Sequence, residues 1–124
     1  MSTTIPISQI GRDVVTFSAG ETIFTAGQAG AIMYIVVAGE VEIRQGERLL
    51  ATARAGEPIG EMELIDHGGR SATATARTDC VLAPITERRF LYLVQETPQF
   101  ALQVMRVLVE RLRHAHTRVL AAQP

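Results

Sequence analysis

Glycine recurs at short intervals through the first two thirds of the chain, and this spacing limits the folds that the chain can adopt. The glycines separate short apolar runs and stand at positions 20, 27, 30, 39, 46, 56, 60, 68 and 69. Short apolar runs divided in this way are typical of short strands joined by tight turns. The length of 124 residues matches the usual size of one domain, so we expect a single mainly β domain over residues 1–124.

The apolar runs that we predict as strands lie at residues 14–17, 22–25, 33–37, 41–44, 48–54, 73–77 and 81–86. The run 33–37 is continuously apolar, which suits a strand buried on both faces, whereas 41–44 alternates with one wet face. Residues predicted to point into the core should each contribute roughly 1.5–3 kcal/mol when fully buried. They are Phe17, Ile23, Ile35, Val37, Val41 and Ile43.

The pattern changes after Thr86, where helical spacing replaces the short strands. We predict one helix over residues 87–96, then Thr97 as an N-cap and Pro98 as the first residue of a longer helix. The β body should therefore span about residues 13–86 and the C-terminal helices about 87–121. One apolar stripe recurs along the longer helix at spacings of three and four, and it comprises Leu102, Met105, Val109, Leu112, His116 and Val119.

Charge and cysteine content exclude several classes of protein. The formal net charge of −1 gives no general attraction to nucleic acid or anionic lipid. The one cysteine, Cys80, cannot form an intramolecular disulfide, and its apolar surroundings favour a buried, inert thiol. We find no signal peptide and no apolar run of the roughly 18 residues that a membrane span needs. We therefore expect a cytoplasmic protein without a membrane span.

The segment from residue 56 to residue 75 concentrates the chemistry needed to bind a sugar phosphate. Gly60 permits close backbone approach, and residues 61–65 can form a short helical turn whose free amides would face an anion. Glu61 can accept a bond from a sugar hydroxyl, Arg70 can donate two parallel bonds to a phosphate, and Ser71 adds a hydroxyl. A structural ion pair between Glu61 and Arg70 would explain the same residues, and the sequence leaves this alternative open.

These residues resemble the phosphate-binding cassette of the cyclic nucleotide-binding domain family, which includes the catabolite activator proteins. Gly60-Glu61 and Arg70-Ser71-Ala72 match the cassette pattern in order. Further matches lie at residues 17–23, 27, 33–41, 90, 93, 98, 111 and 112. The resemblance implies an antiparallel β-roll of the jelly-roll type, followed by C-terminal α-helices.

The resemblance also implies a role for each residue of the cassette. Glu61 would hold the ribose 2′-hydroxyl, Arg70 and Ser71 would hold the cyclic phosphate, and amides near Met62 and Ala72 would assist. The ligand-binding set is then Gly60, Glu61, Met62, Arg70, Ser71 and Ala72. Base contacts are expected at Arg111, Ala115 and His116, where regulators of this family place a polar pair against the purine. The expected ligand is cAMP rather than cGMP, with no other cofactor.

By resemblance, the chain is expected to be a receptor module that passes ligand-driven movement of its C-terminal helix to an effector protein that the sequence does not identify. A homodimer through that helix is a further expectation. Regulators of the family carry a helix-turn-helix after the long helix, and this chain ends at Pro124. We therefore expect a standalone domain without a DNA-binding region and without direct DNA binding.

Two other functions compete with this interpretation. Glu63 stands where the family usually has Ala, Ser or Gly, and a carboxylate beside a phosphate would weaken binding unless it points to solvent. A β-roll protein-interaction module that has lost nucleotide binding is therefore the alternative. A cupin-type metalloenzyme would need His-x-His on a strand, but His114 and His116 lie on a helix, about 200° apart. We expect no catalytic residues and no metal site, and hence no enzyme.

Overall fold

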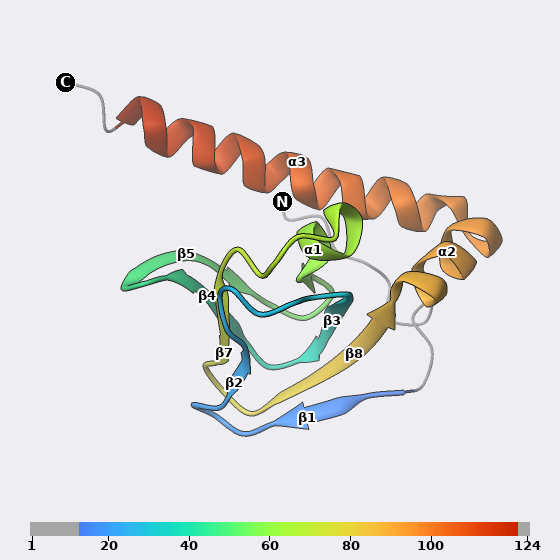
Figure 1. Cartoon of the computed structure of the whole chain (residues 1–124), viewed down its shortest axis with the longest axis horizontal. Coiled ribbons are helices and arrows are strands. Elements are labelled where there is room, and N and C mark those ends of the chain that lie inside the picture. The colour runs from blue at the N-terminus through green and yellow to red at the C-terminus, as the bar shows by residue number, and fades with distance from the viewer. Residues whose placement is uncertain (1–12, 122–124) are drawn as a thin grey trace.

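A computed structural model describes the backbone of residues 13–121 and the side chains through Ala115. Within this part, eight antiparallel strands form two four-stranded sheets (Figure 1). The first sheet has the order β1 (Val15–Phe17), β8 (Cys80–Thr86), β3 (Ile32–Ala38) and β6 (Pro58–Ile59). The second has the order β2 (Thr22–Phe24), β7 (Thr73–Ala76), β4 (Val41–Gln45) and β5 (Arg48–Ala53).

Helices follow and flank the strands, so the predicted fold class, a β-roll of the jelly-roll type with C-terminal helices, is confirmed. The short helix α1 (Glu61–Asp66) lies between β6 and β7 in the chain, and α2 (Glu87–Glu96) follows β8. The long helix α3 (Pro98–Ala121) begins at the predicted proline and passes across the roll above α1 (Figure 1). The hydroxyl of Thr86 caps α2 by accepting a bond from the Arg89 amide.

The strand β6 was not predicted from the sequence, because two residues are too few to show a periodicity. Its residues pair with Tyr34 and Ile35 of β3. This pairing makes β6 the edge strand of the first sheet and places Gly60 and the start of α1 beside β3. The position of the cassette therefore depends on a strand that only the tertiary structure reveals.

The strand β3 separates two apolar clusters, which confirms the prediction that it is buried on both faces. Met33 and Ile35 face a cluster that includes Leu64 of α1 and Phe100 of α3. Val36 belongs to the second cluster, which fills the space between the sheets. Among the predicted core residues, Ile35 and Val41 are fully buried. The others are partly buried and pack against the clusters, namely Phe17, Ile23, Val37 and Ile43.

The helix α3 has two apolar faces, of which the sequence pattern revealed one. The buried face comprises Phe100, Val104 and Val107. The stripe predicted from the sequence lies instead on the exposed side, and its members Leu102, Met105, Val109 and Leu112 are 38%, 52%, 46% and 71% exposed. The side chains of His116 and Val119 lie outside the described part. Over residues 13–121, no helix combines the length and the apolar character needed to cross a membrane.

Candidate functional site

The backbone of Arg70 is anchored to the loop between β2 and β3. The Gly27 amide donates to the Arg70 carbonyl at 2.8 Å, and the Arg70 amide donates to the Gln28 carbonyl at 2.7 Å. These two bonds clamp the end of the cassette loop against a segment more than forty residues earlier in the chain. The side chain is thereby directed into the roll, where it is only 7% exposed.

The guanidinium group of Arg70 is surrounded by hydrogen-bond acceptors and one aromatic ring. It donates to the Ile32 carbonyl at 2.6 Å and to the Gly60 carbonyl at 3.3 Å. It also donates to Oε1 of Glu63 at 3.2 Å. The guanidinium carbon lies 4.1 Å from the centre of the Phe24 ring, within cation–π distance. Burial of this charge is therefore compensated by contacts from three separate segments, which are β2, β3 and α1 with its N-cap.

Two glycines make room for the guanidinium group. A Cβ atom at Gly30 or at Gly60 would overlap the Arg70 side chain. Gly60 also adopts a positive φ of 75° where it caps the start of α1, a conformation that other residues rarely adopt. Gly60 was predicted to allow close approach of a ligand, and here it admits a protein side chain. Gly30 carries no sequence signal that separates it from the other turn glycines.

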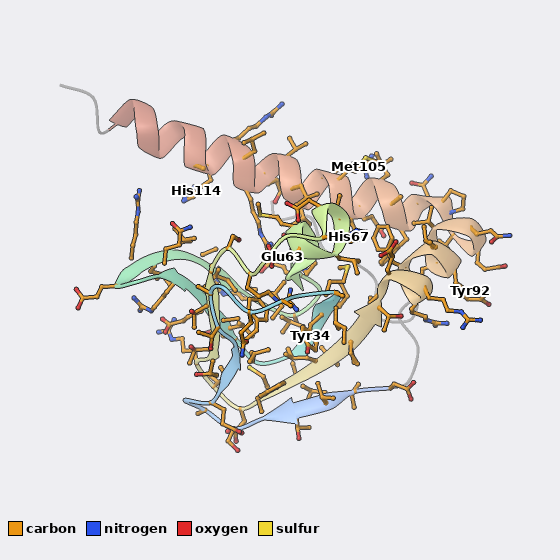
Figure 2. All side chains as sticks on the ribbon, viewed as in Figure 1. Tyr34, Glu63, His67, Tyr92, Met105 and His114 are labelled. Atoms are coloured by element: carbon orange, nitrogen blue, oxygen red, sulfur yellow. The ribbon has the colours of Figure 1, made fainter. Side chains whose placement is uncertain are left out.

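Glu63 points inward and is 4% exposed (Figure 2). Its Oε1 accepts a bond from Arg70, and its Oε2 accepts one from the Ser71 hydroxyl at 3.3 Å. A Glu63 side chain that faced solvent would leave the phosphate position free, but this side chain does not face solvent. Arg70 and Ser71, the two residues expected to hold a phosphate, both contact this carboxylate.

Glu61 is buried at 2% exposure and contacts the long helix rather than Arg70. Its Oε1 accepts a hydrogen bond from Nη1 of Arg111, which also donates from Nη2 to the Pro58 carbonyl at 2.6 Å. Among the residues that the structure describes, the other oxygen, Oε2, has no hydrogen-bond partner. The alternative of a Glu61–Arg70 ion pair is therefore not what forms, because each residue pairs with a different partner.

The remaining predicted site residues lie at varied distances from this centre. Ala72 is buried where β7 is about to begin, whereas Met62 is 51% exposed on the outer side of α1. Of the predicted base contacts, Arg111 touches the cassette and Ala115 is exposed one turn further along α3. The side chain of His116 lies outside the described part.

Two polar contacts hold the loop after α1. Asp66 accepts a bond from the Gly68 amide at 2.8 Å, and Nε2 of His67 lies 2.7 Å from Oε2 of Glu87 on α2. His67 has a positive φ of 59°, which matches its place at the end of α1. Within the described residues, no cluster of three or more histidine, cysteine or acidic side chains could hold a metal ion.

The chain is similar to known proteins over most of its length. The family profile described as "Cyclic nucleotide-binding domain" matches residues 14–97. A curated relative, the cyclic AMP receptor protein of Thermus thermophilus, is 36% identical over 104 residues, covering 80% of this chain and 48% of the relative. The crystal structure of Thermus thermophilus catabolite activator protein is similar with a TM-score of 0.77 and 33% identity, covering 86% of this chain and 53% of that chain.

Two structures of the EAL enzyme Bd1971, in cAMP-bound and cGMP-bound forms, are also similar. Both are 34% identical to this chain, with TM-scores of 0.62 and 0.63, and cover 88% of it and 31% and 30% of their own chains. This chain spans about half the length of the curated relatives that it matches first, at 48% and 49%. The profile match spans β1 to β8, the cassette and α2, and the chain belongs to the cyclic nucleotide-binding domain family.

Proposed function

We propose that this chain is a receptor module that binds cAMP in preference to cGMP and that signals through its C-terminal helix. The observation that carries the proposal is the Oε2 atom of Glu61, a buried acceptor that finds no partner in the described part of the chain. Leaving a buried carboxylate oxygen unpaired costs free energy, so such atoms are rare in proteins without a functional reason. A sugar hydroxyl of a bound ligand would satisfy it.

The cassette supplies the other contacts that a cyclic nucleotide needs. Arg70 and Ser71 are the donors for the cyclic phosphate, and the amides near Met62 and Ala72 assist them. Over the described residues, α1 begins at Glu61 after the N-cap Gly60, which has no side chain to cap the helix, and this keeps the first amides of α1 available to an acceptor. The preference for cAMP is supported by a relative whose name is cyclic AMP receptor protein, whereas the Bd1971 structures carry either nucleotide.

The route from ligand to output runs through Arg111. Its bonds to Glu61 and to the Pro58 carbonyl join α3 to the residues that flank Gly60. A ribose hydroxyl at Glu61 would share that carboxylate with Arg111, and so binding would shift the position or the stability of α3. Because Phe100, Val104 and Val107 are in the core, we expect the response beyond residue 108.

The exposed stripe on α3 is the surface through which we propose that the module meets an effector protein or a second copy of itself. Leu102, Met105, Val109 and Leu112 repeat with a spacing of three and four, as in helices that pack against another helix. Met105 lies on the outer side of α3, away from the roll (Figure 2). On the same helix, we propose that Ala115 and His116 lie near the base of the bound nucleotide. The domain would bind the nucleotide without catalysing a reaction on it.

Calorimetric titration of the wild-type chain with cAMP and with cGMP tests the proposal directly. Saturable binding with cAMP preferred over cGMP is the expected result, and recovery of unchanged nucleotide by chromatography would support a binding role. Hydrogen exchange over residues 100–120 with and without ligand tests the signalling route. Unchanged exchange after residue 108 would contradict a response carried by α3.

A second function has one specific observation in its favour. The inward-facing Glu63 already occupies the donors of Arg70 and Ser71, which fits a β-roll interaction module that has lost nucleotide binding. In that case neither nucleotide would give heat of binding, and the exposed stripe of α3 would carry the function. The same titration separates the two functions.

A further inference from the structure

We propose that Glu63 is a built-in anion that occupies the phosphate position of the cassette and lowers nucleotide affinity by competing for Arg70 and Ser71. The inference rests on the proposed function, because it assumes that these two residues are the donors for the cyclic phosphate. It assigns to this chain a residue that sets affinity without itself contacting the ligand.

The geometry of the carboxylate matches that of the group it would replace. One oxygen of Glu63 accepts from the Arg70 guanidinium at 3.2 Å, and the other accepts from the Ser71 hydroxyl at 3.3 Å. A cyclic phosphate has two free oxygens that share one negative charge. The two oxygens of Glu63 likewise share one charge, and they already contact both donors.

Charge balance makes the competition strong. The side chains of Arg70 and Glu63 are each only 5% exposed, so solvent screens them weakly. A phosphate placed beside an unmoved Glu63 would put two anions next to one guanidinium group. The other nearby cation, Arg111, is already paired with Glu61. Like charges in such a site disfavour one another, and Glu63 must leave before a phosphate can take its place.

Displacement of Glu63 requires the short helix to change. Glu63 lies between Met62 and Leu64, and Leu64 is packed in the core cluster that contains Phe100 of α3. A shift of α1 that carries the carboxylate toward solvent must therefore also move Leu64 within that cluster. Ligand binding and rearrangement of α1 should occur together, directly beneath the helix that we propose as the output (Figure 1).

Substitution of Glu63 tests this competition with cAMP as the probe. Glu63→Gln keeps the shape and removes the charge, and Glu63→Ala removes both. Asp66→Asn is the matched control, because it removes one charge from the same helix at an exposed position and keeps the acceptor for the Gly68 amide. We expect both Glu63 variants to bind cAMP about tenfold more tightly or better, and the control to match wild type.

A second measurement uses inorganic phosphate and does not depend on nucleotide binding. Without a competing carboxylate, phosphate should raise the thermal midpoint of Glu63→Gln relative to chloride at equal ionic strength, whereas wild type should not respond. Circular dichroism of each variant establishes whether it is folded. If Glu63→Ala does not fold, Glu63→Gln alone provides the test.

The outcomes separate the two proposals. Equal cAMP affinity in wild type and both Glu63 variants would overturn the competition and leave the proposed function standing. No cAMP binding by any variant would overturn the proposed function, and the phosphate response would then decide whether Glu63 fills an anion site. Absence of that response in folded Glu63→Gln would overturn the inference.

Discussion

The cassette and the outer face of α3 depart from ordinary protein surfaces and interiors in opposite ways. The cassette buries three charged residues, Glu61, Glu63 and Arg70, at 2%, 4% and 7% exposure. The outer face of α3 leaves Met105 and Leu112 at 52% and 71% exposure. Buried charges persist because partners compensate them, whereas a stripe of exposed apolar residues has no compensation within the described fold.

Under the proposed function, the ligand and the partner would therefore bind separate regions of the molecule. The cassette is polar, nearly closed and satisfied from within, apart from one oxygen of Glu61. The stripe is apolar and open. Arg111 is the contact that joins them, because it is carried by α3 and binds the cassette at Glu61.

The largest effect should come from breaking the buried pair. Arg70→Ala leaves the Glu63 carboxylate buried without its cation, and we expect a loss of about 3–5 kcal/mol in the free energy of unfolding, measured by urea denaturation. The double variant Glu63→Ala/Arg70→Ala removes both charges and should recover part of that loss. A single variant as stable as wild type would show that the cassette does not depend on this pair.

The next effect concerns the unpaired oxygen of Glu61. If Oε2 accepts the ribose 2′-hydroxyl, wild type should bind cAMP about ten- to a hundredfold more tightly than 2′-deoxy-cAMP, and Glu61→Gln should reduce this ratio. Calorimetric titration of both ligands gives the ratio for each protein. Glu57→Gln is the control outside the cassette. Equal affinity of wild type for the two nucleotides would exclude this role.

A smaller effect is expected at the contact between the two regions. Arg111→Gln removes the charge-assisted bond to Glu61. Because the Arg111 side chain is 31% exposed, water can reach the vacated position, and the loss in the free energy of unfolding should be about 1.5 kcal/mol, smaller than for Arg70→Ala. Hydrogen exchange after residue 108 should become faster and insensitive to cAMP. Arg106→Gln alters an exposed arginine of the same helix and serves as the control. Ligand-dependent protection that survives in Arg111→Gln would show that the two regions communicate by another route.

The smallest effect on folding should come from the exposed stripe. Leu112→Glu changes a residue that is 71% exposed, so the free energy of unfolding of the monomer should stay within about 0.5 kcal/mol of wild type. If the stripe joins two copies, sedimentation velocity should show a lower fraction of dimer. Leu91→Glu, at an exposed site on α2, should leave that fraction unchanged. A wild-type protein that remains monomeric at high concentration would contradict dimerisation through the stripe, and an effector protein would then be the partner to test.

Much of the fold could be predicted from local patterns. Glycine spacing and short apolar runs indicated the strands to within a few residues, and the change of period after Thr86 located both C-terminal helices. The backbone geometry of a strand gives a side-chain period of two and that of a helix a period of 3.6, so each pattern can be recognised over a few neighbouring residues. The short strand β6 was not predicted because two residues are too few to show a periodic pattern.

The residues of the cassette stood out in the sequence through their resemblance to a family pattern, since from the residues alone a structural ion pair explained them equally well. Their pairing was not visible. Arg70 could meet Glu61 or Glu63 with equal ease in the linear chain, and only the packing of α1 against β3 directs Glu63 inward. Arg111 lies 50 residues from Glu61, and Gly30 matters because a distant guanidinium group fills the space above it.

The sequence by itself determined the longer strands and the C-terminal helices, because their periodic patterns arise between near neighbours along the chain, but it did not show β6. The tertiary structure alone decided which apolar face of α3 is buried, which carboxylate meets Arg70 and which oxygen of Glu61 stays unpaired. A helix with two apolar faces has no local signal for its orientation. Buried charges pair with whichever partners the fold brings close, however far apart these are in the sequence. In this fold the partners come from α1, the cassette loop and α3.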